Sequence, residues 1–266
     1  MRLEHLILGF AVYSFLGWLC ESTYCSIPAK KFINRGFLNG PFCPVYGFGA
    51  LLVIFLLSPY EDSILALFLC GIVVTSALEY ITGLLLEKCF HTKWWDYSKR
   101  RFNLHGRVCL RNSVMFGVLS VLVMKLIHPP VKNLIDAVPA SLLPVLSYSL
   151  LFYFVVDSII TVHTILALNG KLKQLQKVFD EIKEKSEEHK RQLQQAFEER
   201  MPDELRDRLE RLDKLRTEMA QNTRFLHRRL MNAFPNMRSI RHNEPLRQIK
   251  EALEERRLQR KRNRKK

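Results

Sequence analysis

Five apolar runs in the first 169 residues constrain the fold more than any other feature of this chain. They cover residues 6–27, 42–58, 63–86, 108–127 and 142–168. Each run is long enough for a helix that crosses a bilayer, which needs roughly 17–25 residues. The bilayer core offers the backbone no water to bond, so such spans are helices. We therefore expect an all-α fold that begins with a five-span transmembrane helix bundle.

The distribution of charge divides the chain into two parts. The formal net charge is +15, although 48% of the residues are hydrophobic. Residues 1–169 hold 13 Lys or Arg against 9 Asp or Glu, whereas residues 170–266 hold 28 against 17 and lack a long apolar run. This contrast predicts a transmembrane domain over residues 1–169, followed by a water-exposed basic region.

The loops between the spans differ in charge, which predicts the topology. Loops 28–41 and 87–107 carry three and six basic residues, whereas turn 59–62 has none and loop 128–141 has one. Basic residues collect on the cytoplasmic side of membrane proteins. We therefore expect a multi-pass protein of the cell (inner) membrane with its N-terminus outside and its C-terminus in the cytosol.

Ionisable side chains inside the predicted spans are candidates for a polar cavity. These are Glu21, Glu79, Arg111, Asp157 and His163. With a rise of 1.5 Å per residue, all but the deeper Asp157 lie within roughly 5–11 Å of the inner boundary. One interpretation is a buried pair of Arg111 with Glu21 or Glu79 that pins helices together. The other is a cavity open to the cytosol, because intramembrane charges usually face the interior of the bundle.

The second span begins with a motif rich in glycine and proline. Its residues are Gly36, Gly40, Pro41, Pro44, Tyr46, Gly47 and Gly49. Proline lacks a backbone donor and glycine weakens helices, so the helix should begin irregularly. Irregular backbone beside a span is tolerated only where protein or water surrounds it. The motif predicts a re-entrant or broken helix that faces the bundle interior.

The residues that support enzymatic, metal or cofactor chemistry are sparse. The six cysteines form no C-x-x-C pair, and no Ser/His/Asp grouping or H-E-x-x-H motif occurs. His91, Asp96 and His105 share one cytosolic loop and are a candidate site, although polar loop residues beside aromatic anchors are commoner. An intramembrane enzyme is a minor alternative. We expect no enzyme activity, no metal and no cofactor.

Several short motifs occur together in one order along residues 8–168. They are Trp18-x-x-Glu21, Gly36-Phe37, Gly40-Pro41-Phe42-Cys43-Pro44-x-Tyr46-Gly47-x-Gly49, Glu79-Tyr80-x-x-Gly83, Trp94-Trp95-Asp96-Tyr97 and Phe102-Asn103-x-x-Gly106-Arg107. This combination resembles the type IV putative ABC-transporter permease family of bacterial membrane proteins. The resemblance implies a permease-like transport component.

The resemblance also implies partners. The sequence has no G-x-x-x-x-G-K-[ST] phosphate loop, so an ATPase would be a separate chain. The loop from Trp94 to Arg107 is then the candidate surface for docking that chain or another cytosolic protein. Its candidate residues are Trp94, Trp95, Asp96, Tyr97, Asn103, Gly106 and Arg107.

The cytosolic part shows heptad patterning over residues 170–234. Apolar positions alternate by three and four on both sides of Pro202. Two runs of similar length around a proline predict an antiparallel coiled-coil hairpin, or alternatively one kinked helix that forms a homo-oligomer.

Residues 235–266 form a basic C-terminal tail that ends in a run of Lys and Arg. Such a run is usually disordered and solvated. Its tether to the inner face favours anionic lipid as its partner, at about 1 kcal/mol per basic residue.

Two functions remain open from the sequence. The first is a putative ABC-transporter permease-like protein without its own ATPase. The alternative is a membrane scaffold or signalling protein that recruits a partner through its coiled coil. A large cavity between the spans would favour the first, and a solid apolar bundle the second.

Overall fold

The computed structural model describes residues 2–196, 207, 209–215, 218 and 225–263. These residues are predominantly helical, with four strands of two residues each. The chain divides into two compact units. The first comprises residues 1–163 and 232–237, and the second comprises residues 164–231 and 238–266.

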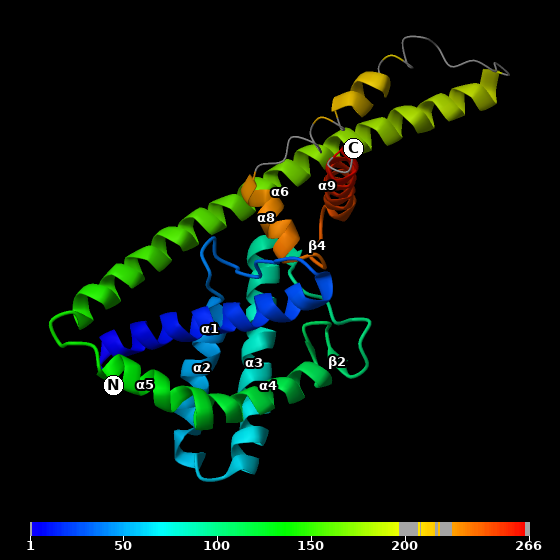
Figure 1. The fold of residues 1–266 in the computed structure, drawn as a ribbon. Helices are drawn as coiled ribbons and strands as arrows, with labels where there is room; N and C mark the ends of the chain where they lie inside the picture. The colour runs from blue at the N-terminus through cyan, green and yellow to red at the C-terminus, as the bar shows by residue number, and fades with distance from the viewer. Residues whose placement is uncertain (1, 197–206, 208, 216–217, 219–224, 264–266) are drawn as a thin grey trace. The chain divides into compact units, whose positions relative to one another are not determined.

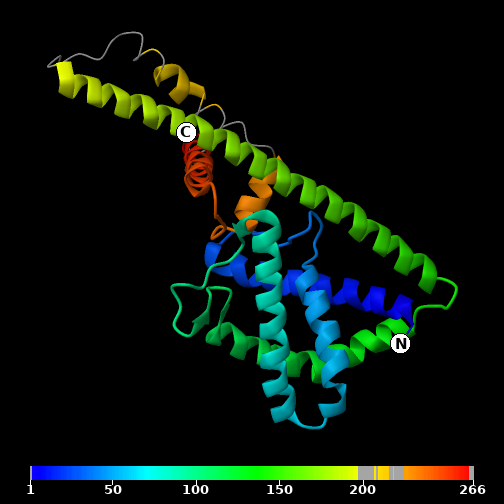
Figure 2. The same ribbon diagram turned by 180° about the vertical axis from the view of Figure 1, so that it is seen from behind.

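Helices make up most of the first unit. They are α1 (Leu3–Ala29), α2 (Pro44–Leu57), the 3-10 turn η1 (Ser58–Tyr60), α3 (Ile64–Phe90), α4 (Leu110–Leu122), the π-helical turn η2 (Val123–Ile127), α5 (His128–Asp136) and the first part of α6 (Leu143–Ala196). Helices α2 and α3 lie side by side as a hairpin in both views (Figures 1 and 2). Three short strands follow α3, namely β1 (Thr92–Lys93), β2 (Asn103–Leu104) and β3 (Val108–Cys109).

Four segments are helical, long and apolar enough to cross a membrane. They are Leu3–Ile27, Ile64–Phe90, Leu110–Asp136 and Leu143–Glu188, and the apolar helix Pro44–Tyr60 is shorter. The predicted all-α class is therefore confirmed for the described residues, and four of the five predicted spans coincide with such helices. The remaining predicted span, at 42–58, coincides with the shorter helix Pro44–Tyr60.

The fourth helix continues further than expected. A loop over residues 128–141 is predicted from the sequence, but helix continues from Leu110 to Asp136. Pro129 and Pro130 lie in the first turn of α5, directly after the π-helical turn. Proline lacks an N–H, so it fits best where a helical turn begins and the local bonding pattern has already shifted. The predicted loop therefore begins only after Asp136.

Small residues allow the spans to approach one another. A Cβ atom on Gly71 of α3 would lie 2.6 Å from the Cβ atom of Ser120 on α4. The hydroxyl of Ser76 on α3 donates to that of Ser113 on α4 at 2.8 Å. Small residues and interhelical hydrogen bonds of this kind hold membrane helices together where there is no water to drive association.

The main core of the first unit contains buried residues from α1, α2, α3, η2, α5 and α6. They are Leu8, Tyr13, Ala50, Val53, Ile54, Leu57, Leu67, Met124, Val131, Ile135 and Leu143. A smaller cluster of Ala11, Leu38 and Phe154 lies under the loop that precedes α2. Leu38 of this loop is therefore packed against α1 and α6, and this packing holds the irregular segment before α2 in place.

The second unit is also helical. It contains the rest of α6, most of α8 (Phe225–Ala233), strand β4 (Arg238–Ser239) and α9 (Asn243–Asn263). Along α6, the heptad residues Leu172 and Leu175 are buried, and Phe179 and Ile182 are half-buried, whereas Lys173 and Gln174 are exposed. The heptad stripe is thus the less exposed face of the helix. Pro202 and part of the second heptad run, including Leu205, Arg216, Met219 and Thr223, lie outside the described residues, so the hairpin stays a prediction.

The basic run differs from the expectation of an unfolded tail. Helix α9 continues through Arg256 and ends at Asn263. Residues 251–255, which precede the run, are strong helix formers, and the run itself has neither glycine nor proline to end the helix.

Candidate functional site

A cavity of about 630 Å³ lies among the helices of the first unit. Its lining combines apolar and aromatic side chains from α1 to α4 with residues of the two loops that flank α2 and α3 and with Phe234. A volume of this size is typical of sites for small molecules. Of its described lining residues, three carry a charge: Glu21, Arg35 and Glu79.

Glu21 and Arg35 form an ion pair at the edge of the cavity. The Nη2 atom of Arg35 donates to Oε1 of Glu21 at 2.9 Å, and both side chains are largely shielded from solvent. Burial lowers the pKa of Arg35, but the Glu21 carboxylate raises it more, so the pKa lies above its ordinary value. Arg35 therefore stays charged beside Glu21.

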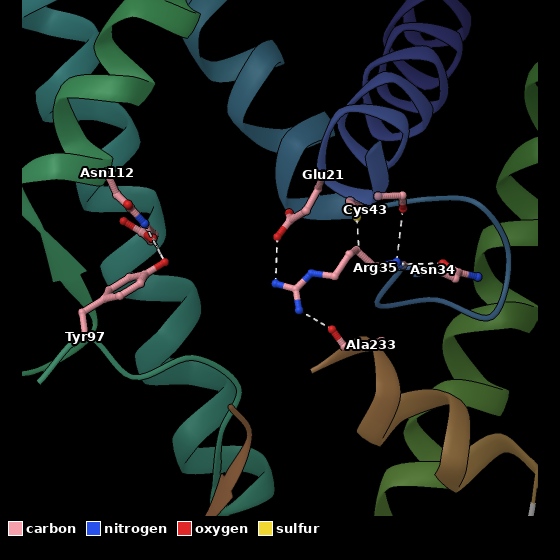
Figure 3. A network of polar contacts seen from close by, with 10 residues as sticks. Glu21, Asn34, Arg35, Cys43, Tyr97, Asn112 and Ala233 are labelled. Carbon is pink, nitrogen blue, oxygen red and sulfur yellow. Dashed lines mark hydrogen bonds and ion pairs between the residues drawn. The ribbon is translucent and has the colours of Figure 1, made fainter. Parts of the chain in front are cut away.

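Arg35 also holds a segment from the other end of the chain. Its Nη1 atom donates to the main-chain carbonyl oxygen of Ala233, and its guanidinium lies 5.2 Å from the ring centroid of Phe234. Phe234 in turn packs edge-on against Trp94, with 4.9 Å between the ring centroids. The carbonyl and the ion pair are visible together in Figure 3. Phe234 is thereby fixed as part of the cavity wall.

The loop that carries Arg35 is tied down along its length. The Oδ1 atom of Asn34 accepts from the indole of Trp18 at 2.7 Å and from the main-chain N–H of Gly36 at 2.9 Å. The hydroxyl of Ser22 accepts from the N–H of Arg35 at 3.2 Å. These bonds satisfy an irregular backbone that lies beside a span, as the membrane environment demands.

Asp157 anchors the rest of the same loop from α6. Its two carboxylate oxygens accept from the backbone N–H groups of Asn39 and Gly40 at 2.9 and 2.8 Å, and from the Nδ2 atom of Asn39 at 2.9 Å. The Tyr153 hydroxyl donates to the same carboxylate at 3.1 Å. Only 5% of Asp157 is exposed. Its charge is therefore satisfied by the loop that precedes α2.

The contact with Tyr153 and Asp157 favours glycine at position 40. A Cβ atom there would lie 1.9 Å from the hydroxyl oxygen of Tyr153 and 3.3 Å from Oδ2 of Asp157. Helix α2 then begins at Pro44 after an extended Cys43. Gly47 lies close to Ser14 and Phe10 of α1, where a Cβ atom would clash at 2.3 and 2.7 Å. Members of the motif thus permit close backbone approach on both sides of the helix start.

Glu79 lies on α3 beside the loop that follows it. The Tyr97 hydroxyl donates to Oε1 of Glu79 at 3.3 Å and accepts from Nδ2 of Asn112 at 2.7 Å. Burial and then the charge of Glu79 raise the pKa of Tyr97, so its hydroxyl remains a donor. Figure 3 shows Tyr97 and Asn112 apart from the group of Glu21, Arg35 and Ala233.

The candidate docking loop is folded mainly upon itself. The indole of Trp95 donates to the carbonyl oxygen of Arg107 at 2.8 Å, and Arg107 binds Oε2 of Glu87 through Nε and Nη2 at 3.1 and 2.8 Å. Asn103 accepts from the N–H of Gly106 at 3.0 Å, and Asp96 accepts from Ser98. Gly106 has a φ of +70°, which favours glycine. These residues shape the loop, and Trp94 is only 4% exposed.

The most exposed apolar residues of this loop are not among the predicted docking residues, although Phe102 belongs to one of the motifs. Phe102 is 79% exposed and Leu104 56%, and both lie at the tip formed by β2 and the turn to β3. Lys99, Arg100 and Arg101 beside them are also exposed. This tip is therefore more accessible than Trp94.

The structure brings together only some of the predicted site residues. Glu21 and Glu79 both line the cavity, whereas Arg111, Asp157 and His163 are not among its described lining residues. Arg111 and His163 are exposed. Within the described residues Arg111 has no ion-pair partner, and the cation beside Glu21 is Arg35 instead. Arg35, Asn39 and Phe234 were missed as functional residues, although Arg35 directly precedes the glycine motif.

The four long apolar helices are those of a helical membrane protein. The family model for Putative ABC-transporter type IV matches residues 8–162, so the chain belongs to this family. The resemblance inferred from the sequence is thereby confirmed. No curated protein and no solved structure is significantly similar to the chain. The protein is thus a transporter-related membrane protein.

Proposed function

We propose that this protein is a permease-type subunit that binds its substrate in the cavity and is driven by a separate ATPase chain. The observation that carries the proposal is the cavity of about 630 Å³ with an ion pair at its edge. A scaffold has no need for a space of this size, whereas a small-molecule substrate does. The family membership supports the same class of function.

The proposal includes five spans, with α2 as the second and the N-terminus outside. Phe37 of the first basic loop packs edge-on against Trp94 of the second, with ring centroids 5.2 Å apart. This contact supports the two loops being at the same end of the bundle. If α3 crosses the membrane between them, the chain must cross once more, and α2 is the segment in between. The shortness of α2 fits a loop that dips into the bundle before the helix begins.

The sequence supports a separate motor chain because it contains no phosphate-binding loop. The exposed tip at Phe102 and Leu104, with three basic neighbours, is the surface we assign to its docking. Apolar side chains within a charged rim are typical of protein interfaces. The basic helix α9 is assigned to anionic lipid of the inner leaflet.

Purification of the tagged full chain from its native membrane in mild detergent tests the proposal. We expect a chain with a G-x-x-x-x-G-K-[ST] motif to co-purify and the preparation to hydrolyse ATP. Phe102→Asp should greatly reduce the recovered ATPase, because a charge would be buried at the interface. Phe225→Asp is the matched control, since Phe225 is 77% exposed and lies outside this loop.

A stable complex without any nucleotide-binding chain would contradict the proposal. It would support the alternative, a scaffold that recruits a partner through the heptad face of α6. The two outcomes are separated by the identity of the co-purified chain together with the ATP hydrolysis that it brings.

A further inference from the structure

Among the charged residues that line the cavity, Glu79 is the one without an ion-pair partner in the described lining. The described lining holds one cation, Arg35, and Glu21 already binds it at 2.9 Å. The net formal charge of the lining is therefore −1, and it belongs to Glu79. A carboxylate beside an apolar cavity within a membrane bundle is costly without a partner.

The contacts of Glu79 leave part of its bonding capacity unused. Oε1 accepts from Tyr97 at 3.3 Å, which is a long bond. Oε2 is buried and has no hydrogen-bond partner among the described residues. Asn112 also interacts with the carboxyl group as a side-chain hydrogen-bond donor, and its Nδ2 atom donates to the Tyr97 hydroxyl at 2.7 Å. The site thus offers acceptor capacity that its own side chains do not fill.

The remainder of the cavity suits an apolar body. Its lining includes the aromatic rings of Trp94, Trp95 and Phe116 and many aliphatic side chains. Aromatic faces also attract cations. A bare metal ion would not be held here, because hard cations need six or more oxygen ligands and no group of metal-binding side chains occurs among the described residues.

We propose that the cavity binds an amphipathic organic cation, whose charged group lies against Glu79 and whose apolar body packs on the aromatic wall. The inference rests on the proposed function in that the cavity is taken as the substrate site. It adds the chemical class of the substrate and the residue that selects it.

The test compares two probes of similar shape and opposite charge. The full chain is placed in nanodiscs of zwitterionic lipid, and binding of tetraphenylphosphonium and of tetraphenylborate is measured by equilibrium dialysis against empty nanodiscs. We expect saturable binding of the cation at about one per chain and none of the anion. Glu79→Gln should weaken binding of the cation at least tenfold, because it removes the charge and keeps the shape.

Two further variants serve as controls. Glu61→Gln removes a carboxylate at an exposed turn and should leave binding unchanged. Glu79→Asp keeps the charge and should retain binding within a few-fold. If Glu79→Gln fails to fold, the comparison of the two probes on the unaltered chain still decides.

Three results would overturn the inference. They are equal binding of both probes, absence of saturable binding of the cation, and unchanged binding of the cation by folded Glu79→Gln. None of them depends on the ATPase. If the cation does not bind but an ATPase co-purifies, the inference is wrong and the proposed function stands. If the cation binds but no ATPase co-purifies, the inference stands and the proposed function is wrong.

Discussion

The guanidinium of Arg35 lies over the ring of Phe234, 5.2 Å from its centroid, although the two residues come from opposite ends of the sequence. Arg35 simultaneously binds Glu21 and the carbonyl oxygen of Ala233. One side chain therefore joins α1, the loop before α2 and the segment at residues 232–237. The stability of the cavity wall should depend on it.

Arg35→Gln should lower the free energy of unfolding by roughly 3 kcal/mol, the lower end of the cost of leaving a buried charge unpaired. The measurement is chemical denaturation of the purified chain in detergent. Replacing Glu21 and Arg35 together by Gln should restore much of the loss, since no charge is then unpaired. Arg111→Gln is the control, because Arg111 is exposed. A larger loss for Arg111→Gln than for Arg35→Gln would contradict the observed pairing.

Phe234→Ala should make the cavity more accessible. The ring pair with Trp94 is lost, and such a pair contributes about 0.5–1.5 kcal/mol. Cys43 is buried and lines the cavity, so it can report the change once the other five cysteines are replaced by Ser. Its reaction with a maleimide should accelerate roughly two- to twelvefold, the equivalent of that energy. Phe225→Ala should leave the rate unchanged, and equal rates in both variants would mean that Phe234 does not close the wall.

Asp157→Asn should destabilise the loop before α2. In the unaltered chain the N–H groups of Asn39 and Gly40 each donate to one carboxylate oxygen of Asp157. In the variant an NH2 group replaces one of these oxygens and cannot accept a hydrogen bond. Each bond to a charged group contributes about 1.5–3 kcal/mol. We expect a loss of roughly 3 kcal/mol in detergent denaturation. Asp62→Asn in the exposed turn is the control. Full stability together with loss of cellular function would contradict this anchoring role and would indicate that Asp157 acts in substrate binding.

The orientation can be checked by labelling single cysteines in intact cells. A cysteine introduced at 58–62 should react with a membrane-impermeant maleimide, whereas one introduced at the exposed part of 93–105 should react only after lysis. Lys99→Cys and Asp62→Cys are suitable because both side chains are exposed. Labelling of position 99 in intact cells would contradict the predicted orientation and support the opposite one.

The sequence predicted the helices well because their signal is local. Length and hydropathy located the spans, and their bounds differ from the helices mainly at the ends. The differences have local causes as well. Helix α4 continues through η2 and α5 because the two prolines fall where a helical turn begins, and α6 continues past Gly170 because one glycine costs a helix only about 1 kcal/mol.

The pairing of side chains was not predictable in the same way. Depth along a span placed Arg111 near Glu21 and Glu79, but depth does not determine the direction in which a side chain points. Arg35 reaches Glu21 because its loop folds back along α1, and the bonds that fold it are made by Asn34 and Ser22. The partners of Asp157 are backbone N–H groups, which no residue type reveals.

The anchoring of Asn39 and Gly40 by Asp157 has a consequence for biosynthesis. The loop is made 118 residues before the helix that completes it. At synthesis rates of about 5–20 residues per second, that interval is roughly 6–24 s. During this time the N–H groups of Asn39 and Gly40 must be bonded by water or by the insertion machinery, because their acceptor does not yet exist. The loop before α2 is therefore among the last parts of the bundle to be completed, although it is among the first to be synthesised.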